Sequence, residues 1–177
     1  RLQYNAKDDE KKKLNTWNHL GRRPYDRNYN LTNKEKATFN KYLSSLGVAG
    51  SGSELENIKK IENGIKNDIV LYSYVDESKA DALDSIINKK VATESGYIRL
   101  FVACLTQAGV KHELGVTSDR TTHKVESNFE NWAVLDDYLI YFPNLKQFLA
   151  PTRVNYRYPV IPVENTSNMG VFCTIPP

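Results

Sequence analysis

The chain has 177 residues, of which 40% are hydrophobic and 25% are charged, values that indicate one globular domain, with or without an arm, and argue against disordered and collagen-like classes. Its 24 basic and 21 acidic residues are scattered together and leave a net charge of +3, which is too balanced for a nucleic-acid partner. No apolar run approaches the roughly 20 residues that cross a bilayer, so no transmembrane segment is predicted in this sequence.

The N-terminal part of the chain is predicted to be helical. Sparse apolar residues at helical spacing over 7–20 predict a surface helix, and turn-favouring residues over 22–31 predict a loop. Thr32 followed three residues later by Glu35 is a capping box, which predicts a second helix that ends at Gly47.

Two further helices and an extended segment are predicted next. Ser53 and Glu56 form a second capping box, and apolar residues follow it at spacings of three and four, which predicts an amphipathic helix. The β-branched and aromatic segment 69–74 predicts a short strand or an extended link. A short helix is predicted over 79–88.

The strongest helical pattern covers residues 94–108 and ends at Gly109, a typical C-terminal stop. This helix is expected at the centre of the fold. Strands are predicted after it, from Val110 to Val116, over 129–135 and over 138–142. Because helices precede strands, we predict an α+β fold in which N-terminal helices pack on a mostly antiparallel sheet.

The domain boundaries are predicted from composition. The glycine- and serine-rich stretch near residue 50 separates a helical N-terminal arm, residues 1–50, from the core domain, residues 51–165. Residues 166–177 are predicted to form an extended exit segment toward a following β domain. The N-terminus has neither an initiator Met nor the apolar stretch of a signal peptide, so we expect an excised piece, and any export signal would lie upstream of it.

The cysteines and histidines form no recognisable metal site. Cys104 and Cys173 are far apart in sequence and make no CxxC pair, and the three histidines make no HExxH or HxxxH pattern. Neither a metal nor another cofactor is therefore predicted. The sequence leaves open whether the two cysteines form a disulfide.

Three segments carry a family resemblance. They are the helix and extended segment from Ile58 to Tyr74, the helix and turn from Glu94 to Val110, and the pair Asn131-Trp132 with Leu149 to Thr152. In order and spacing they resemble the transglutaminase-like superfamily, which shares a papain-type core of a helix packed on an antiparallel sheet. The resemblance covers about Leu55 to Ile161 and is greatest to bacterial envelope proteins in which such a domain sits between β-sandwich domains.

In working members of that family a Cys at the N-terminus of the central helix attacks a carbonyl, and a His and an Asp on successive strands complete the relay. The resemblance places the Cys position at Glu94, the His position at Trp132, or at Asn131 one residue earlier, and the Asp position at Ala150. None of these residues supplies the family's chemistry. No Cys occurs before Cys104 and no His after residue 123, so a shift of register does not restore the triad.

We therefore predict a pseudoenzyme, with no catalytic residues, that serves as a binding or scaffold module. The resemblance implies a larger periplasmic, cell-surface or secreted protein, whose neighbouring domains are partners and whose degenerate cleft binds a peptide or a glycan. The central helix should begin at Glu94, facing the strand that carries Trp132. The residues predicted to line the cleft are Glu94, Tyr97, Asn131, Trp132 and Ala150.

Two alternatives stay open at this point. An active hydrolase or amidase would have to use a displaced residue, and the candidates are Cys104, His112 and Glu94. A purely structural spacer between domains is the other alternative. Simpler interpretations of the single residues are that Cys104 is a small apolar core residue, that His112 faces solvent from a strand and that Trp132 belongs to the core.

Overall fold

The structure is a computed structural model that describes residues 32–48, 52–72, 82–125 and 132–173. The helix predicted over 7–20 and the loop predicted over 22–31 lie outside the described residues, as does Asn131.

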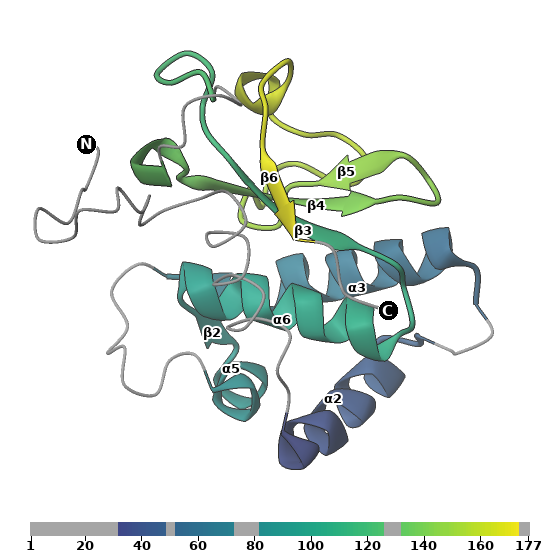
Figure 1. The fold of residues 1–177 in the computed structure, drawn as a ribbon. Helices are drawn as coiled ribbons and strands as arrows, with labels where there is room; N and C mark the ends of the chain where they lie inside the picture. Colours follow the sequence, from purple (N-terminus) through teal and green to yellow (C-terminus); the bar gives the residue numbers. More distant parts are fainter. Residues whose placement is uncertain (1–31, 49–51, 73–81, 126–131, 174–177) are drawn as a thin grey trace, which may run out of the picture.

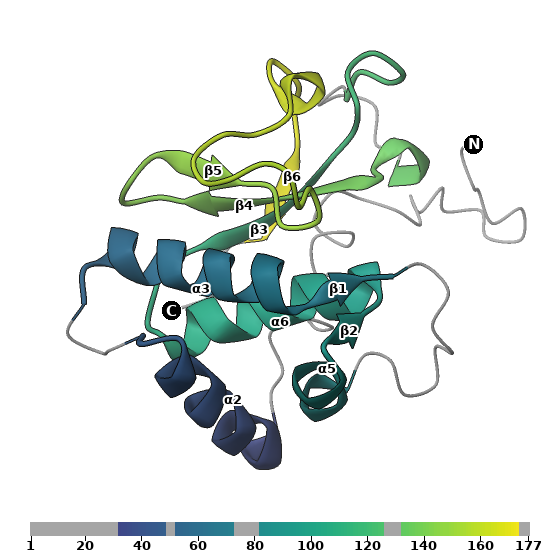
Figure 2. The same ribbon diagram turned by 180° about the vertical axis from the view of Figure 1, so that it is seen from behind.

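A four-stranded sheet lies over two helices, α3 (Glu54–Asp68) and α6 (Glu94–Gln107), as Figures 1 and 2 show from opposite sides. Two more helices, α2 (Asn33–Ser45) and α5 (Leu83–Lys89), pack on the side of α6 that faces away from the sheet. The predicted α+β class, with helices packed on a sheet, is therefore confirmed.

The helix boundaries follow from local signals. Both predicted capping boxes are present, with Thr32 and Glu35 at the start of α2 and Ser53 and Glu56 at the start of α3. The chain leaves α2 and α6 through glycines with positive φ, 66° at Gly47 and 68° at Gly109, and glycine adopts this conformation at little cost. The helix predicted over 79–88 begins at Leu83 within the described part of the chain.

All neighbouring strands of the main sheet are antiparallel, in the order β5-β4-β3-β6. A separate parallel pair, β1 and β2, precedes the N-terminal end of α6. The strand bounds are β1 Val70–Leu71, β2 Val91–Ala92, β3 Glu113–Thr117, β4 Asp137–Phe142, β5 Gln147–Leu149 and β6 Val171–Cys173.

Two predictions about extended segments need correction. The strand predicted over 129–135 is wrong over Trp132–Val134, which form the 3-10 helix η1. The chain joins the sheet just after this turn, where the Asp136 N–H donates to the Thr117 carbonyl oxygen at 3.0 Å. Residues 171–173 are extended as predicted, but they pair with β3 and so belong to the core sheet and not to an exit segment.

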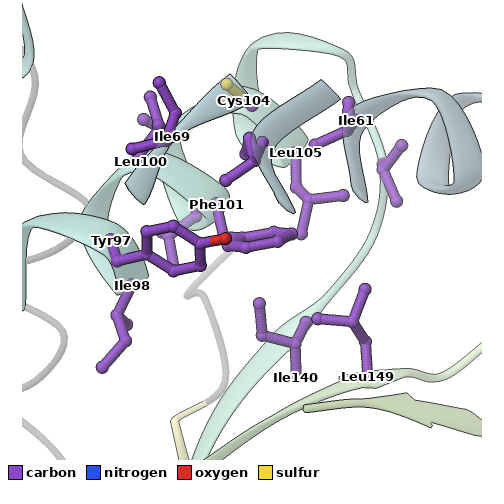
Figure 3. Packing of buried hydrophobic residues seen from close by; sticks show 14 of the residues in the cluster. Ile61, Ile69, Tyr97, Ile98, Leu100, Phe101, Cys104, Leu105, Ile140 and Leu149 are labelled. Carbon is purple, nitrogen blue, oxygen red and sulfur yellow. The ribbon is translucent and has the colours of Figure 1, made fainter. Parts of the chain in front are cut away.

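One hydrophobic core joins the helices to the sheet. Phe101 of α6 points toward Ile140 and Leu149 of the sheet, whereas Cys104 points away from them (Figure 3). Phe39 of α2 belongs to the same buried cluster. Although α2 falls in the region predicted to be an N-terminal arm, it is therefore packed into the core.

His112 is buried, contrary to the expectation that it faces solvent. Only 1% of its surface is exposed, and its Nδ1 lies 2.8 Å from the Val110 carbonyl oxygen. Burial lowers the pKa of His112 from its ordinary value, and the contact with Val110 opposes this effect. The imidazole is therefore favoured in its neutral form.

This burial predicts acid sensitivity. Below the ordinary His pKa of about 6.5, the unfolded chain binds a proton at His112 that the folded chain does not, so stability falls as pH decreases from 7.5 to 5. The slope from one such proton is at most about 1.4 kcal/mol per pH unit. Urea denaturation at several pH values measures this slope.

The slope should become smaller in His112→Gln. It should not change in the control His123→Gln, because His123 is exposed. An unchanged slope in His112→Gln would contradict this interpretation.

Candidate functional site

The N-terminal end of α6 positions Glu94. Thr93 is the N-cap, and its hydroxyl oxygen accepts a hydrogen bond from the Gly96 N–H at 3.1 Å. Glu94 is the first helical residue, as predicted. Unpaired backbone N–H groups give this end of a helix a partial positive charge, which favours a carboxylate there.

A second carboxylate, Asp137, stands at the first residue of β4 and is held by two donors. Arg153 Nη2 donates to Asp137 Oδ2 at 2.7 Å, and Asn165 Nδ2 donates to the same oxygen at 3.0 Å. Asp137 is only 4% exposed, whereas 43% of the Arg153 side chain is exposed. The ion pair therefore has a buried acidic partner and a basic partner that reaches solvent.

Glu94 interacts electrostatically with this pair. Partial burial raises the pKa of Glu94, the carboxylate of Asp137 raises it further, and the Arg153 guanidinium opposes the rise. Glu94 as a residue is still exposed to solvent. We refer to Glu94, Asp137, Arg153 and Asn165 as the Glu94 cluster.

The loop after β5 is anchored by a buried lysine of α3. Lys66 Nζ donates to three backbone carbonyl oxygens, at 2.9 Å to Ala150, 3.3 Å to Arg153 and 2.7 Å to Tyr156. It also forms an ion pair with Glu62 at 2.9 Å, in which both side chains are almost fully buried. Burial lowers the pKa of Lys66, and Glu62 opposes this effect.

Glu62 fixes the far end of the same loop. Both of its carboxylate oxygens accept from the Tyr158 N–H, at 2.9 and 3.0 Å. The Lys66–Glu62 pair therefore holds residues 150–158 against α3, and this loop carries Arg153 into the Glu94 cluster.

No protein-family model, curated protein or solved structure matches this chain. Within the described ranges, no group of three or more His, Cys, Asp or Glu side chains is arranged to hold a metal ion. No helix in the described part of the chain is long and apolar enough to cross a membrane.

The residues predicted to line the cleft differ in position and in burial. Glu94 lies at the helix end as expected, and Ala150 directly follows β5 but is only 1% exposed. Trp132 begins a 3-10 helix and not a strand, while Asn131 lies outside the described residues. Tyr97 is fully buried and belongs to the hydrophobic core.

Two of the three candidates for displaced catalysis, Cys104 and His112, are buried. Cys104 is free and fully enclosed, and burial raises the pKa of its thiol. It follows Glu94 by ten residues along α6, which corresponds to about 15 Å at 1.5 Å per residue. Cys173 is also buried and is in no disulfide. The two cysteines therefore form no disulfide, and neither thiol stands at the helix end.

Three members of the Glu94 cluster were not predicted. Asp137 lies just before the predicted strand 138–142, Arg153 directly follows the Ala-Pro-Thr motif, and Asn165 lies in the turn η2 (Val163–Asn165). A charged residue at the start of a predicted strand is a local signal that pointed to Asp137. No local signal pointed to Asn165, because its role depends on a contact 28 residues away in sequence.

Proposed function

We propose that this chain is a non-catalytic binding module built on a transglutaminase-like scaffold, within a larger secreted or envelope protein whose other domains are its partners. The observation that carries the proposal is Glu94 at the N-terminal end of α6, where the family has its nucleophile. A carboxylate is a much weaker nucleophile for acyl transfer than a thiolate.

The order of elements around Glu94 supports the scaffold. Asp137, the first residue of β4, acts electrostatically on Glu94, the first residue of the central helix. The neighbouring strand β5 ends one residue before Ala150. In the family, the Cys, His and Asp positions follow the same sequence of helix, strand and strand. On this basis we assign the second position to Asp137 in place of Trp132.

The charges of the Glu94 cluster favour a peptide ligand. The partly exposed Arg153 guanidinium offers donors for a carbonyl or carboxylate, and the exposed edge of Glu94 accepts from N–H groups. Peptide segments present both kinds of group.

Binding to peptide and glycan arrays tests the proposal, with hits quantified in solution. Arg153→Ala and Glu94→Gln should each weaken peptide binding, by about tenfold for Arg153→Ala because charge-assisted hydrogen bonds are lost. Arg157→Ala is the matched control, since Arg157 is also exposed but donates to Asn67 Oδ1 at 2.8 Å. Peptide binding that survives both cluster variants would refute the assigned site, and binding of glycans alone would refute the ligand class.

One observation favours the alternative of an active hydrolase. A carboxyl group whose pKa is raised by burial and by a second carboxylate is a typical general acid, and burial and the Asp137 carboxylate both raise the pKa of Glu94. Hydrolysis of peptide and ester substrates by wild type but not by Glu94→Gln would support it. We expect no such activity.

We expect both cysteines of the folded protein to resist alkylation and to react only after unfolding, because both are buried. Rapid alkylation of folded Cys104, with loss of a measured hydrolytic activity, would overturn the pseudoenzyme proposal.

A further inference from the structure

The face of the sheet that points away from α3 and α6 carries an aromatic cluster. Tyr141 and Phe148, paired across β4 and β5, have ring centroids 4.8 Å apart. The Phe172 ring of β6 lies 6.0 Å from Phe148 and 6.2 Å from Tyr141. The Phe172 ring can pack directly against β3 because residue 115 of that strand is glycine. A Cβ at this position would overlap with the ring.

A pocket of about 290 Å³ opens beside this cluster. Its lining is mainly apolar and includes Leu139, Phe148 and Phe172 from the sheet. The loop before β6 contributes Ile161 and Met169, and Met169 is 52% exposed at the rim. Two phenyl rings, branched aliphatic side chains and a thioether suit a flat apolar group.

Among the described residues that line the pocket, one buried side-chain oxygen has no hydrogen-bond partner. Asn165 is only 5% exposed, and its Nδ2 donates to Asp137 Oδ2 at 3.0 Å, which fixes the orientation of the amide. Within the described part of the chain, Asn165 Oδ1 is buried and accepts no hydrogen bond. An unpaired buried acceptor is costly, and a ligand donor removes that cost.

Other polar lining groups are already engaged. Thr117 Oγ1 donates to the Met169 carbonyl oxygen at 2.7 Å, and Thr166 Oγ1 donates to the Val163 carbonyl oxygen at 2.7 Å. The first of these bonds joins the loop to β3. Asn165 Oδ1 is therefore the acceptor to which we assign ligand recognition.

We propose that this pocket binds a flat apolar group that carries one N–H or O–H donor, of the indole or phenol class, with the donor directed to Asn165 Oδ1. The pocket is lined by none of Glu94, Asp137 and Arg153, although Asn165 donates to Asp137 in the cluster and is also a lining residue of the pocket. The proposal does not depend on the transglutaminase-like assignment.

Titration of the full chain with indole, followed by amide NMR shifts, tests the pocket. For a ligand of about ten non-hydrogen atoms we expect saturable binding with a Kd of about 1 mM. Ile161→Trp should fill the pocket and weaken indole binding at least about tenfold. Val160→Trp is the matched control, because Val160 is 59% exposed and is not a lining residue; its Kd should stay within about twofold, as for substitutions away from the site.

A comparison with 1-methylindole, which lacks the donor, tests the role of Asn165. Wild type should bind indole about tenfold more tightly than 1-methylindole, and the two affinities should become equal in Asn165→Leu. Equal affinities in wild type would refute the role of Asn165 even if Asn165→Leu did not fold. Absence of saturable indole binding, or binding that Ile161→Trp leaves unchanged, would refute the pocket.

Discussion

Replacing Lys66 with methionine is expected to lower the free energy of unfolding by about 3–5 kcal/mol, the usual cost of leaving a buried charge without its partner. Glu62 would remain 3% exposed without its cation, and three carbonyl oxygens that Lys66 now satisfies would lose their donor. Urea denaturation monitored by circular dichroism measures the change.

Lys59→Met is the matched control for this loss. Lys59 lies on the same helix but is exposed, so its replacement should change stability by no more than about 0.5 kcal/mol. If Lys66→Met were no more destabilising than Lys59→Met, the Lys66–Glu62 pair would not hold the loop in the way that its hydrogen bonds indicate.

We expect a cysteine at position 94 to become reactive when Asp137 is replaced with histidine. The helix end favours a thiolate in Glu94→Cys, but the carboxylate of Asp137 disfavours it. An imidazolium in place of that carboxylate reverses the effect. At pH 7 the rate of alkylation at residue 94 should rise about tenfold over the single variant.

The control for this experiment is Glu94→Cys with Asp137→Asn, which removes the negative charge without adding an imidazole. Native Cys104 and Cys173 add little background because both are buried, and peptide mass mapping separates them from position 94. Equal rates for the His and Asn variants would show that position 137 is not placed to activate position 94, and our assignment of the second family position would fail.

The helices could be predicted because their signals are local. The capping boxes at Thr32 and Ser53 bring together residues only three apart, and each is found in the structure. The same periodicity did not identify the role of Tyr97, because α6 is covered by helices on one side and by the sheet on the other. A helix buried on both sides has no single exposed face from which ligand contacts can be inferred.

The parts that could not be predicted depend on contacts between distant segments. In sequence β6 looks like any extended segment, and only its pairing with β3, from Val171 opposite Val116 to Cys173 opposite Leu114, makes it part of the sheet. The Glu94 cluster likewise requires Arg153 to reach Asp137, which depends on a loop that Lys66 holds from another helix. The pattern of residues in a short segment does not reveal contacts with residues that are distant in the sequence.

The position of β6 affects how the domain folds while it is being synthesised. It is the last strand in the described part of the chain, yet it covers the edge of β3 and supplies the Phe172 ring that lies against Gly115. During synthesis that edge stays unpaired until residues 171–173 have left the ribosome, and an open strand edge is a template for aggregation. A recombinant fragment cut at residue 165 would keep this vulnerability permanently and would also lack one wall of the pocket.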